Sequence, residues 1–247
     1  MPHLTATRAD WLAARTALLA EEKELTRRRD ELAARRRELP WVRIETDYRF
    51  TGPEGEVGLA DLFAGRGQLL VYHFMLGPGW GEGCASCSYV SDHFDACLPH
   101  LAARDVALVA VSRAPYAEIA AFRQRMGWTF PWFSSFGSGF NHDFGVSFTA
   151  AELQSGAVAY NYARGPFPAE EAPGLSAFAR DASGQVSHTY STYARGLDGL
   201  IGTYALLDLA PRGRDEAALG FTMAWVRHHD RYATAPAAAC GRCVPGG

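Results

Sequence analysis

The feature that most constrains the fold is an apolar run that leads into a pair of cysteines. Residues 69–74 are almost entirely apolar, and Cys84 and Cys87 follow after a glycine-rich bend. A short apolar run bounded by turn residues predicts a buried strand, and the residues after Cys87 predict a helix. Unpaired N–H groups and the dipole at a helix N-terminus stabilise a thiolate. We therefore expect Cys84 to have a lowered pKa, with Cys87 one helical turn away.

A second buried strand is predicted after that helix. Residues 106–111 are continuously apolar, which is typical of a parallel strand covered on both faces. The helix between the strands is expected to run to about Arg104, with a kink at Pro99, because proline disrupts helix hydrogen bonding. Pro115 then begins another helix that ends near Gly127. These segments predict a βαβ unit with the cysteine pair at its first helix.

The end of the sheet is predicted from a hairpin signal. Residues 181–184 are rich in turn-forming side chains and separate two strand-like segments, 175–180 and 185–191. This pattern predicts an antiparallel pair of strands. A helix over 197–207 is expected to pack on them. The stretch 149–171 carries few strong signals, and we interpret it as an insertion or a lid.

A long charged helix is predicted over residues 9–39, which contain no Gly or Pro. One heptad position is apolar throughout, at Trp11, Leu18, Leu25, Leu32 and Leu39. This stripe is too narrow for a convincing coiled coil. We expect the helix to lie across the domain or against a second subunit. Its arginine runs are interleaved with Glu and Asp, which favours a solvated surface over a phosphate-binding face.

Composition and charge exclude several classes of protein. Hydrophobic content of 48% with 21% charged residues is ordinary for a globular protein. The net charge of −3 gives no general attraction for nucleic acid or an anionic membrane. No apolar run approaches the ~20 residues that span a bilayer, and residues 1–10 lack a secretory leader pattern. We therefore expect a cytoplasmic protein with no nucleic-acid partner and no membrane partner.

The length of 247 residues favours one domain with extensions. The expected parts are an N-terminal helical arm (1–40), an α/β domain (41–210), a C-terminal helix (211–232) and a flexible tail (233–247). The tail contains a second cysteine pair, Cys240 and Cys243. We interpret this pair as a redox relay or part of a passive tail. A zinc site built from both cysteine pairs is the weaker alternative.

The predicted order of elements is βαβ, helix, β-hairpin, helix, with a Cys-x-x-Cys pair at the first helix. This is the thioredoxin arrangement, in which such a motif is redox-active. A dithiol there shuttles between thiols and a disulfide through a mixed disulfide. Position makes Cys84 the nucleophile and Cys87 the resolving thiol. The alternatives are that both are packed cysteines or metal ligands.

Four residues near the dithiol are candidates for supporting roles. Trp80 either contacts substrate or simply packs. The charge of Glu82 is expected to oppose thiolate formation, so the net pKa of Cys84 stays open. Arg113 and His73 lie near the C-terminal ends of adjacent parallel strands, where α/β proteins place ligands. For Arg113, substrate binding and a surface salt bridge both stay open. For His73, a hydrogen-bonded core or edge histidine is favoured.

Three further features have ordinary interpretations. Thioredoxin-like proteins place a cis-proline before the hairpin, but Leu175 stands at that position and Pro173 is favoured as an ordinary strand-entry proline. Cys97 is expected to be a buried small hydrophobe. His228 and His229 are interpreted as a solvated or interface cluster, because adjacent helical side chains point about 100° apart.

Five separate segments make the chain resemble a known family. They are GCASCS (83–88), VSRAP (111–115), RMGWTFPW (125–132), HTYSTY (188–193) and GTY (202–204). Together they look like a bacterial thioredoxin-like family known as a domain of unknown function, and the resemblance covers about residues 10–232. It implies a thioredoxin-like central sheet flanked by helices and a predicted dithiol-disulfide oxidoreductase. It also implies that Cys84 and Cys87 are the dithiol.

The chain departs from the peroxiredoxin pattern Pro-x-x-x-Thr/Ser-x-x-Cys, because Gly77 and Gly81 replace the proline and the hydroxyl residue. The leading hypothesis is a thiol-disulfide oxidoreductase or thiol-dependent reductase that acts on a disulfide-bearing protein or a small thiol. It requires no cofactor and no metal. The alternative is a non-catalytic binding or assembly protein with a structural dithiol, forming a homo-oligomer through the N-terminal helix.

Overall fold

The computed structural model describes residues 5–232 of the chain. It divides into two compact units, the first ending at Val42 and the second beginning at Arg43. The predicted tail, with Cys240 and Cys243, lies outside the described residues.

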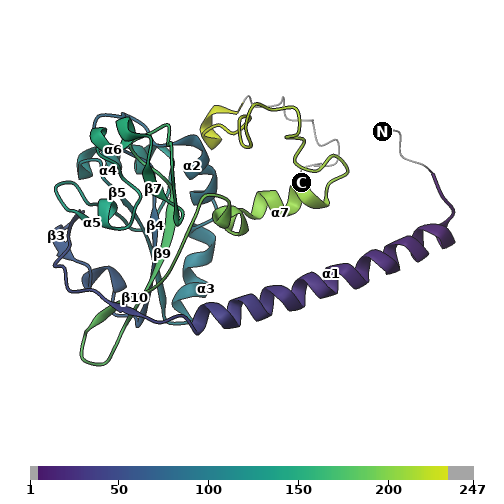
Figure 1. Cartoon of the computed structure of the whole chain (residues 1–247), viewed down its shortest axis with the longest axis horizontal. Helices are drawn as coiled ribbons and strands as arrows, with labels where there is room; N and C mark the ends of the chain where they lie inside the picture. The colour runs from purple at the N-terminus through teal and green to yellow at the C-terminus, as the bar shows by residue number, and fades with distance from the viewer. Residues whose placement is uncertain (1–4, 233–247) are drawn as a thin grey trace, which may run out of the picture. The chain divides into compact units, whose positions relative to one another are not determined.

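The first unit is a single helix, α1 (Arg8–Arg37), drawn in purple in Figure 1. Thr7 caps it by accepting a hydrogen bond from the backbone N–H of Asp10, and three arginines lie in the last turn, where they complement the helix dipole. No residue of α1 is buried, and the apolar stripe is exposed at Trp11 (48%), Leu18 (50%), Leu25 (51%) and Leu32 (46%). The predicted long helix is confirmed. Within residues 5–232, no helix is both long enough and apolar enough to cross a membrane.

The second unit is built on a sheet with the strand order β1-β10-β9-β4-β5-β6-β2-β3. In chain order the strands are β1 (Val42–Arg43), β2 (Arg49–Gly52), β3 (Gly55–Gly58), β4 (Gln68–His73), β5 (Val106–Ser112), β6 (Trp132–Ser134), β9 (Gly174–Arg180) and β10 (Val186–Tyr193). A separate small sheet pairs β7 (Val158–Tyr160) with β8 (Ala163–Gly165).

Strands β10, β9, β4 and β5 form the core that the sequence predicts. β4 and β5 are parallel, with Leu70 opposite Leu108, so the chain must cross over between them. β9 runs antiparallel to both β4 and β10, with Leu175 opposite Tyr72. A parallel βαβ unit followed by an antiparallel hairpin is the thioredoxin-like arrangement. The predicted α/β fold class is therefore confirmed.

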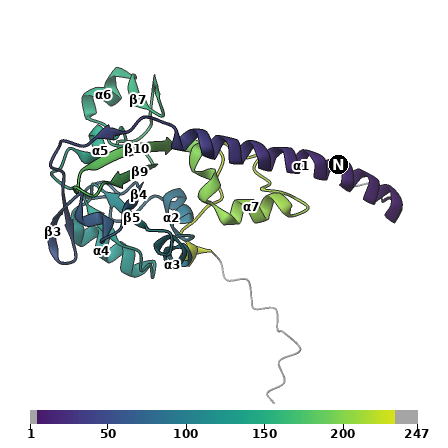
Figure 2. The same ribbon diagram turned by 90° about the horizontal axis from the view of Figure 1, so that it is seen from below.

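Helices cover both faces of this sheet. The helices of the second unit are α2 (Ala85–Ser91), α3 (Leu98–Ala102), α4 (Tyr116–Arg125), α5 (Phe140–Asp143), α6 (Ala150–Ser155) and α7 (Gly202–Leu209), with short 3₁₀ helices η1 (Asp61–Phe63), η2 (Asp95–Cys97), η3 (Ala194–Leu200) and η4 (His229–Arg231). Side chains alternate between faces along β4. Tyr72 packs with α2, α4 and α7, whereas Val71 packs with η1 and α5. Figure 2 shows α2 and α4 on one side of the sheet and α5 on the other.

The long helix predicted after the dithiol is instead broken into three pieces, α2, η2 and α3. Pro99 lies in the first turn of α3, where its missing N–H has no intrahelical partner to lose. It therefore begins a helix and does not kink one. Cys97 ends η2 and is exposed, so the prediction that it is buried is wrong. Because the helix is interrupted before Cys97, this side chain no longer lies on the helix face that packs on the sheet.

The C-terminal helix predicted over 211–232 is also wrong, because most of this segment folds into turns. The carboxylate of Glu216 accepts hydrogen bonds from the Tyr204 hydroxyl at 2.7 Å, the Met223 backbone N–H at 2.9 Å and the Trp225 indole at 2.7 Å. Met223 also has a φ of 67°, in the left-handed region, which a right-handed helix excludes. These non-local hydrogen bonds override the helical pattern of the sequence.

Two segments hold structure that the sequence did not predict. The aromatic stretch after α4 contains β6, which pairs in parallel with β5. The stretch interpreted as an insertion contains α6, β7 and β8. Phe148, Val158 and Ala172 form a small core of its own there. Each of these strands is three residues long, too short for a clear alternation of polar and apolar side chains.

Candidate functional site

Cys84 and Cys87 lie at the start of α2, and both are free thiols. Cys84 is the N-cap residue and is partly exposed, whereas Cys87 is 1% exposed. The backbone N–H of Cys84 donates a hydrogen bond to the carbonyl of Met75 at 3.0 Å. The carbonyl of Cys84 accepts from the N–H and the hydroxyl of Ser88, each at 2.9 Å. These bonds hold the first cysteine between the end of β4 and the beginning of α2.

The two thiols have opposite electrostatic environments. The pKa of Cys84 is lowered from 9.0 to about 6, first by a hydrogen bond from the Cys87 thiol and then by the backbone N–H groups of Cys87 and Ser86, against the opposing effect of burial. The pKa of Cys87 is raised well above its ordinary value, first by burial and then by the neighbouring Cys84. At neutral pH the negative charge therefore belongs on Cys84.

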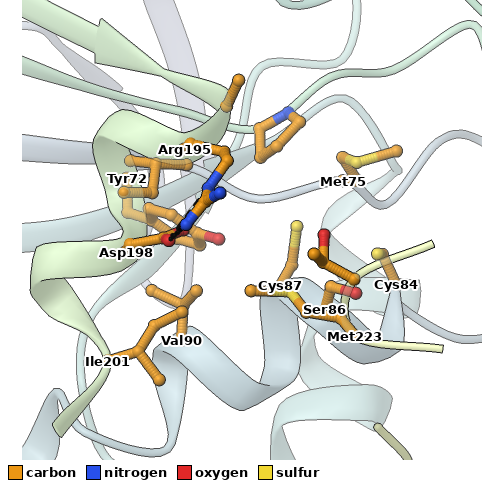
Figure 3. Close-up of a pocket in the computed structure, with 14 residues that line it drawn as sticks. Tyr72, Met75, Cys84, Ser86, Cys87, Val90, Arg195, Asp198, Ile201 and Met223 are labelled. Atoms are coloured by element: carbon orange, nitrogen blue, oxygen red, sulfur yellow. Dashed lines mark hydrogen bonds and ion pairs between the residues drawn. The ribbon is translucent and has the colours of Figure 1, made fainter. Parts of the chain in front are cut away.

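Both cysteines line a cavity of about 230 Å³. Figure 3 shows the Cys87 side chain between those of Arg195 and Met75. Apolar side chains that include Val90, Ile201 and Met223 form much of the wall. The charged lining residues are Arg195 and Asp198, which are paired with each other at 2.8 Å. The cavity is thus largely apolar, and its two opposite charges compensate each other.

Tyr72, at the end of β4, reaches the same cavity (Figure 3). Its side chain is 0% exposed, and its hydroxyl has no hydrogen-bond partner within residues 5–232. Buried hydroxyl groups normally have a partner, because an unpaired one loses its hydration without compensation. From its sequence, Tyr72 was predicted to lie in a buried strand, with no role in the site. The signal that could have identified it is a phenol within an otherwise apolar strand that leads into the dithiol.

The C-terminal segment holds the loop that precedes Cys84. The Nε2 of His228 lies 2.8 Å from the carbonyl oxygen of Gly83, and its Nδ1 lies 3.1 Å from the guanidinium of Arg125. Because a guanidinium can only donate, Nδ1 accepts and Nε2 carries the proton. His228 is 4% exposed, so the predicted solvated or interface cluster is wrong for this residue. Burial against the dithiol loop is a long-range contact that sequence spacing does not reveal.

Glu82 lies in that same loop and forms ion pairs with Arg231 at 2.6 Å and Arg125 at 3.0 Å. Its pKa is lowered, chiefly by the hydrogen bond from Arg231. Arg125 also pairs with Asp230 at 2.9 Å. The negative charge that was expected to oppose the Cys84 thiolate is therefore compensated by two guanidinium groups.

Trp80 and Arg113 meet at a pair of glutamates and are not among the residues that line the cavity. The indole of Trp80 donates to Glu170 at 2.9 Å. The guanidinium of Arg113 donates to Glu171 at 2.6 Å and lies 3.5 Å from Glu170. Glu171 is 1% exposed, and burial raises its pKa. The structure thus brings the two predicted substrate-binding residues together through the carboxylates of Glu170 and Glu171. These glutamates shortly precede the cavity-lining Pro173 in the chain.

His73 is a buried, hydrogen-bonded histidine, as favoured from the sequence. Its Nε2 lies 2.8 Å from the hydroxyl of Ser176, and its ring packs against Phe140 and Phe144. Burial lowers its pKa to about 3, so the ring is neutral at physiological pH. It packs with α5, on the face of the sheet opposite the dithiol.

Pro173 directly precedes β9, as expected of a strand-entry proline, and no peptide bond within residues 5–232 is cis. Its carbonyl accepts a hydrogen bond from the Tyr160 hydroxyl at 2.8 Å. In the same part of the chain, no group of three or more His, Cys, Asp or Glu side chains is arranged to hold a metal ion. A zinc site that uses Cys240 and Cys243 would lie outside the described residues.

Comparison with solved structures finds similarity to a peroxidoxin and a peroxiredoxin at low sequence identity. The peroxidoxin BcpB of Mycobacterium tuberculosis is 16% identical with a TM-score of 0.42, and the match covers 67% of this chain and 94% of that chain. A peroxiredoxin Q of Xanthomonas campestris is 16% identical with a TM-score of 0.44, covering 67% and 95%.

Among curated proteins, none matches the chain. A family of bacterial proteins matches residues 1–232, a span that contains every element of the fold and the whole dithiol cavity. The family resemblance seen in the five sequence segments is thereby confirmed. The chain belongs to the DUF899 family, described as bacterial proteins of unknown function.

Proposed function

We propose that this protein is a thiol-disulfide oxidoreductase that works through Cys84 and Cys87. The observation that carries the proposal is the asymmetry of the pair. Cys84 is partly exposed with a pKa of about 6, whereas Cys87 is buried with a raised pKa. A nucleophile needs a thiolate at working pH, and a resolving thiol needs to stay protonated until the mixed disulfide forms.

The first step is attack by the Cys84 thiolate on one sulfur of a substrate disulfide. A bond forms between the Cys84 sulfur and that substrate sulfur while the substrate S–S bond breaks. The other half of the substrate departs as a thiolate and takes a proton from water. Deprotonated Cys84 needs no separate base for this step, because its pKa already lies below neutral pH.

The second step releases the product. Cys87 gives its proton to water and its sulfur attacks the Cys84 sulfur, which forms the Cys84–Cys87 disulfide and expels the second substrate thiolate. We assign Tyr72 as the hydrogen-bond donor to the Cys87 sulfur as it becomes negative. Burial raises the pKa of Tyr72 well above its ordinary value, so the phenol keeps its proton. In total the dithiol loses two electrons and the substrate leaves as two thiols.

The proposed substrate is a disulfide-bearing protein or a small disulfide, and a thiol restores the reduced pair. This chemistry uses only the sulfur atoms of the chain and of the substrate. We propose that Trp80 and Arg113 contact larger substrates beside the cavity. Support comes from their position, since Trp80 lies four residues before Cys84 in the chain. A reducing cytoplasm would supply the thiol donor.

The test is steady-state reduction of a small aromatic disulfide and of a protein disulfide, with dithiothreitol as the donor. Cys84→Ser is expected to abolish turnover, and Cys87→Ser, mixed with the substrate without dithiothreitol, is expected to accumulate a Cys84–substrate mixed disulfide. Cys97→Ser is the matched control, because Cys97 is a free but exposed thiol outside the cavity. Equal rates for the parent and both dithiol variants would show that the proposed function is wrong.

A second candidate function is assembly through α1. The carrying observation is that this 30-residue helix contains no buried residue and presents a leucine every seven positions. A full-length triple variant is expected to have a lower molar mass by light scattering than the parent. Its substitutions are Leu18→Ser, Leu25→Ser and Leu32→Ser. Leu206→Ser with Leu209→Ser is the control, since both leucines are exposed outside α1. An unchanged mass in the triple variant would remove the support for assembly through this helix.

A further inference from the structure

The dithiol cavity has a buried apolar wall and an exposed rim. Val90 and Ile201 in the wall are 3% and 2% exposed. Figure 3 shows both on the far side of Cys87 from Cys84. Cys84 is partly exposed and the Arg195 side chain is 76% exposed, so both lie at the rim. A molecule that passes Cys84 therefore leaves water for a surface of aliphatic side chains, which favours an apolar molecule.

The charged side chains at the cavity are neutralised by their own neighbours. The carboxylate of Asp198 pairs with the guanidinium of Arg195 at 2.8 Å and with that of Arg214 at 3.3 Å. Arg214 also pairs with Asp208 at 2.7 Å. Two positive and two negative charges are therefore balanced within this group. Because burying a charge without a partner is unfavourable, the cavity favours an uncharged ligand over a cation or an anion.

The volume of the cavity limits the size of its ligand. The cavity measures about 230 Å³, whereas an apolar cavity of about 150 Å³ holds one benzene molecule. By proportion, the ligand has at most roughly nine non-hydrogen atoms. A disulfide within a protein is flanked by backbone on both sides and exceeds this size. A protein disulfide therefore meets Cys84 only at the rim.

We propose that the cavity is the substrate-binding site and that the preferred substrate is a small, uncharged, apolar disulfide, such as a short dialkyl disulfide. This proposal rests on the proposed function, because it specifies which disulfide the Cys84–Cys87 pair reduces. Both thiols line the cavity, so a disulfide that occupies it lies beside the groups that reduce it. Charged disulfides and protein disulfides react at the rim and more slowly.

The reaction keeps one half of the substrate in the cavity. The Cys84 thiolate attacks the sulfur of the bound half, a bond forms between these two sulfurs, and the substrate S–S bond breaks. The outer half leaves into water as a thiolate and takes up a proton. Cys87 then loses its proton to water and attacks the Cys84 sulfur, which releases the bound half as a second thiolate that takes up a proton. Two electrons pass from the dithiol to the substrate, and the products are two thiols.

The first experiment compares three disulfides that differ only in their terminal groups. Dipropyl disulfide, bis(2-hydroxyethyl) disulfide and cystamine end in a methyl, a hydroxyl and an ammonium group. Each kcat/KM value is divided by the rate constant for the same disulfide with dithiothreitol alone, which removes differences in intrinsic reactivity. The normalised value for dipropyl disulfide is expected to be at least about tenfold higher, because an apolar pocket disfavours a hydroxyl isostere by up to about 100-fold. Equal normalised values, or a higher value for a protein disulfide, would overturn the proposal.

The second experiment narrows the cavity by one methylene group. Val90→Leu is expected to lower the normalised kcat/KM for dipropyl disulfide by about tenfold relative to that for dimethyl disulfide, because one methylene in an apolar pocket changes kcat/KM by about 10- to 200-fold. Val226→Leu is the matched control, since Val226 is also 3% exposed and belongs to the same apolar cluster but does not line the cavity. A ratio that stays unchanged in Val90→Leu, or falls equally in both variants, would contradict binding in the cavity.

The third experiment detects binding without reaction. Dipropyl sulfide has the same alkyl groups but no S–S bond, so it is expected to occupy the cavity of the reduced protein without oxidising it. The methyl NMR signals of Met75 and Met223, which line the cavity, are expected to shift. The signal of Met126 is the internal control, because Met126 is buried in the same cluster but does not line the cavity. Dipropyl sulfide is also expected to slow alkylation of Cys84 by iodoacetamide.

The outcomes separate the substrate class from the proposed function. Shifted Met75 and Met223 signals without reduction of any disulfide would overturn the proposed function and, with it, the substrate. Reduction of all disulfides at equal normalised rates, with unshifted methionine signals, would leave the oxidoreductase standing and remove the small apolar substrate. Preference for dipropyl disulfide together with shifted signals supports both.

Discussion

Tyr72 and Cys87 meet in the interior of the cavity, and each shifts the pKa of the other. Burial is the main cause of the raised pKa of Tyr72, and the charge of Cys87 adds to it. Conversely, the nearby Tyr72 hydroxyl lowers the pKa of Cys87, although burial and Cys84 raise it by more. The phenol has no hydrogen-bond partner of ordinary geometry among the described residues. It is therefore available to a sulfur that becomes negative.

Tyr72→Phe is expected to slow the second step of the reaction. A hydrogen bond to a charged group contributes about 1.5–3 kcal/mol, so loss of the phenol predicts a decrease of roughly 10- to 100-fold in the rate of mixed-disulfide resolution. The rate of the first step, followed by alkylation of Cys84, is expected to change much less. Rapid quenching and mass spectrometry measure the two steps separately.

Tyr89→Phe is the matched control for this prediction. Tyr89 is buried in the same apolar cluster and its hydroxyl also has no partner within residues 5–232, but it does not line the cavity. Removing the Tyr89 hydroxyl tests how much the resolution rate changes when any buried hydroxyl beside α2 is lost. Equal resolution rates in Tyr72→Phe and the parent would contradict the role assigned to Tyr72.

Alkylation of Cys84 is expected to follow a titration centred near pH 6 instead of near 9.0, because hydrogen bonds lower its pKa by more than burial raises it. Cys87→Ala removes the largest lowering cause, so it should move the midpoint upward. Cys87→Ser keeps a hydroxyl donor and should move it less. Iodoacetamide rates between pH 4 and 10 measure this, and identical midpoints in all three proteins would refute the hydrogen-bond explanation.

The same shift predicts a pH dependence of stability. The folded pKa of Cys84 lies below its unfolded pKa of about 9.0. The thiolate therefore stabilises the reduced protein fully at pH values above the unfolded pKa, and this stabilisation is lost as pH falls through about 6. The difference in unfolding free energy between the reduced parent and Cys84→Ser should therefore shrink between pH 9 and pH 6. Urea titrations at the two pH values test this, and a constant difference would contradict it.

His228→Ala is expected to destabilise the protein by about 2–3 kcal/mol, since it leaves the buried carbonyl of Gly83 without its partner. The loosened loop should also slow alkylation of Cys84. His229→Ala is the control, because His229 is more exposed and pairs with Asp92 near the surface; about 1 kcal/mol or less is expected. Chemical denaturation compares the two. Similar effects from both substitutions would argue against a special role for His228.

Arg113→Met is expected to destabilise the protein by about 3 kcal/mol, because it removes the positive partner of Glu171, which is 1% exposed. Glu171→Gln should cost less, since an amide can still hydrogen bond to Ser147. Urea denaturation provides the measurement. If Arg113→Met instead keeps full stability and specifically weakens reduction of a protein disulfide, the residue acts in substrate binding and not in holding Glu171.

The fold was largely predictable because its strands carry strong local patterns. β4 and β5 are covered on both faces and so appear as continuous apolar runs, and the β9–β10 hairpin has a clear turn at 181–184. The position of Cys84 and Cys87 followed from the same patterns. The C-terminal segment was predicted incorrectly, because Glu216 takes three non-local hydrogen bonds that no local pattern encodes.

The sequence by itself determined the order of the elements, the long N-terminal helix and a dithiol at the start of a helix, because each depends on neighbouring residues. Tertiary structure alone decided what surrounds that dithiol. It buries Cys87 against Tyr72, pairs Trp80 and Arg113 with glutamates and attaches His228 and Arg231 to the dithiol loop. Most of these contacts join residues that are far apart in the sequence. Their energies arise from burial and charge pairing, which exist only after the chain has folded.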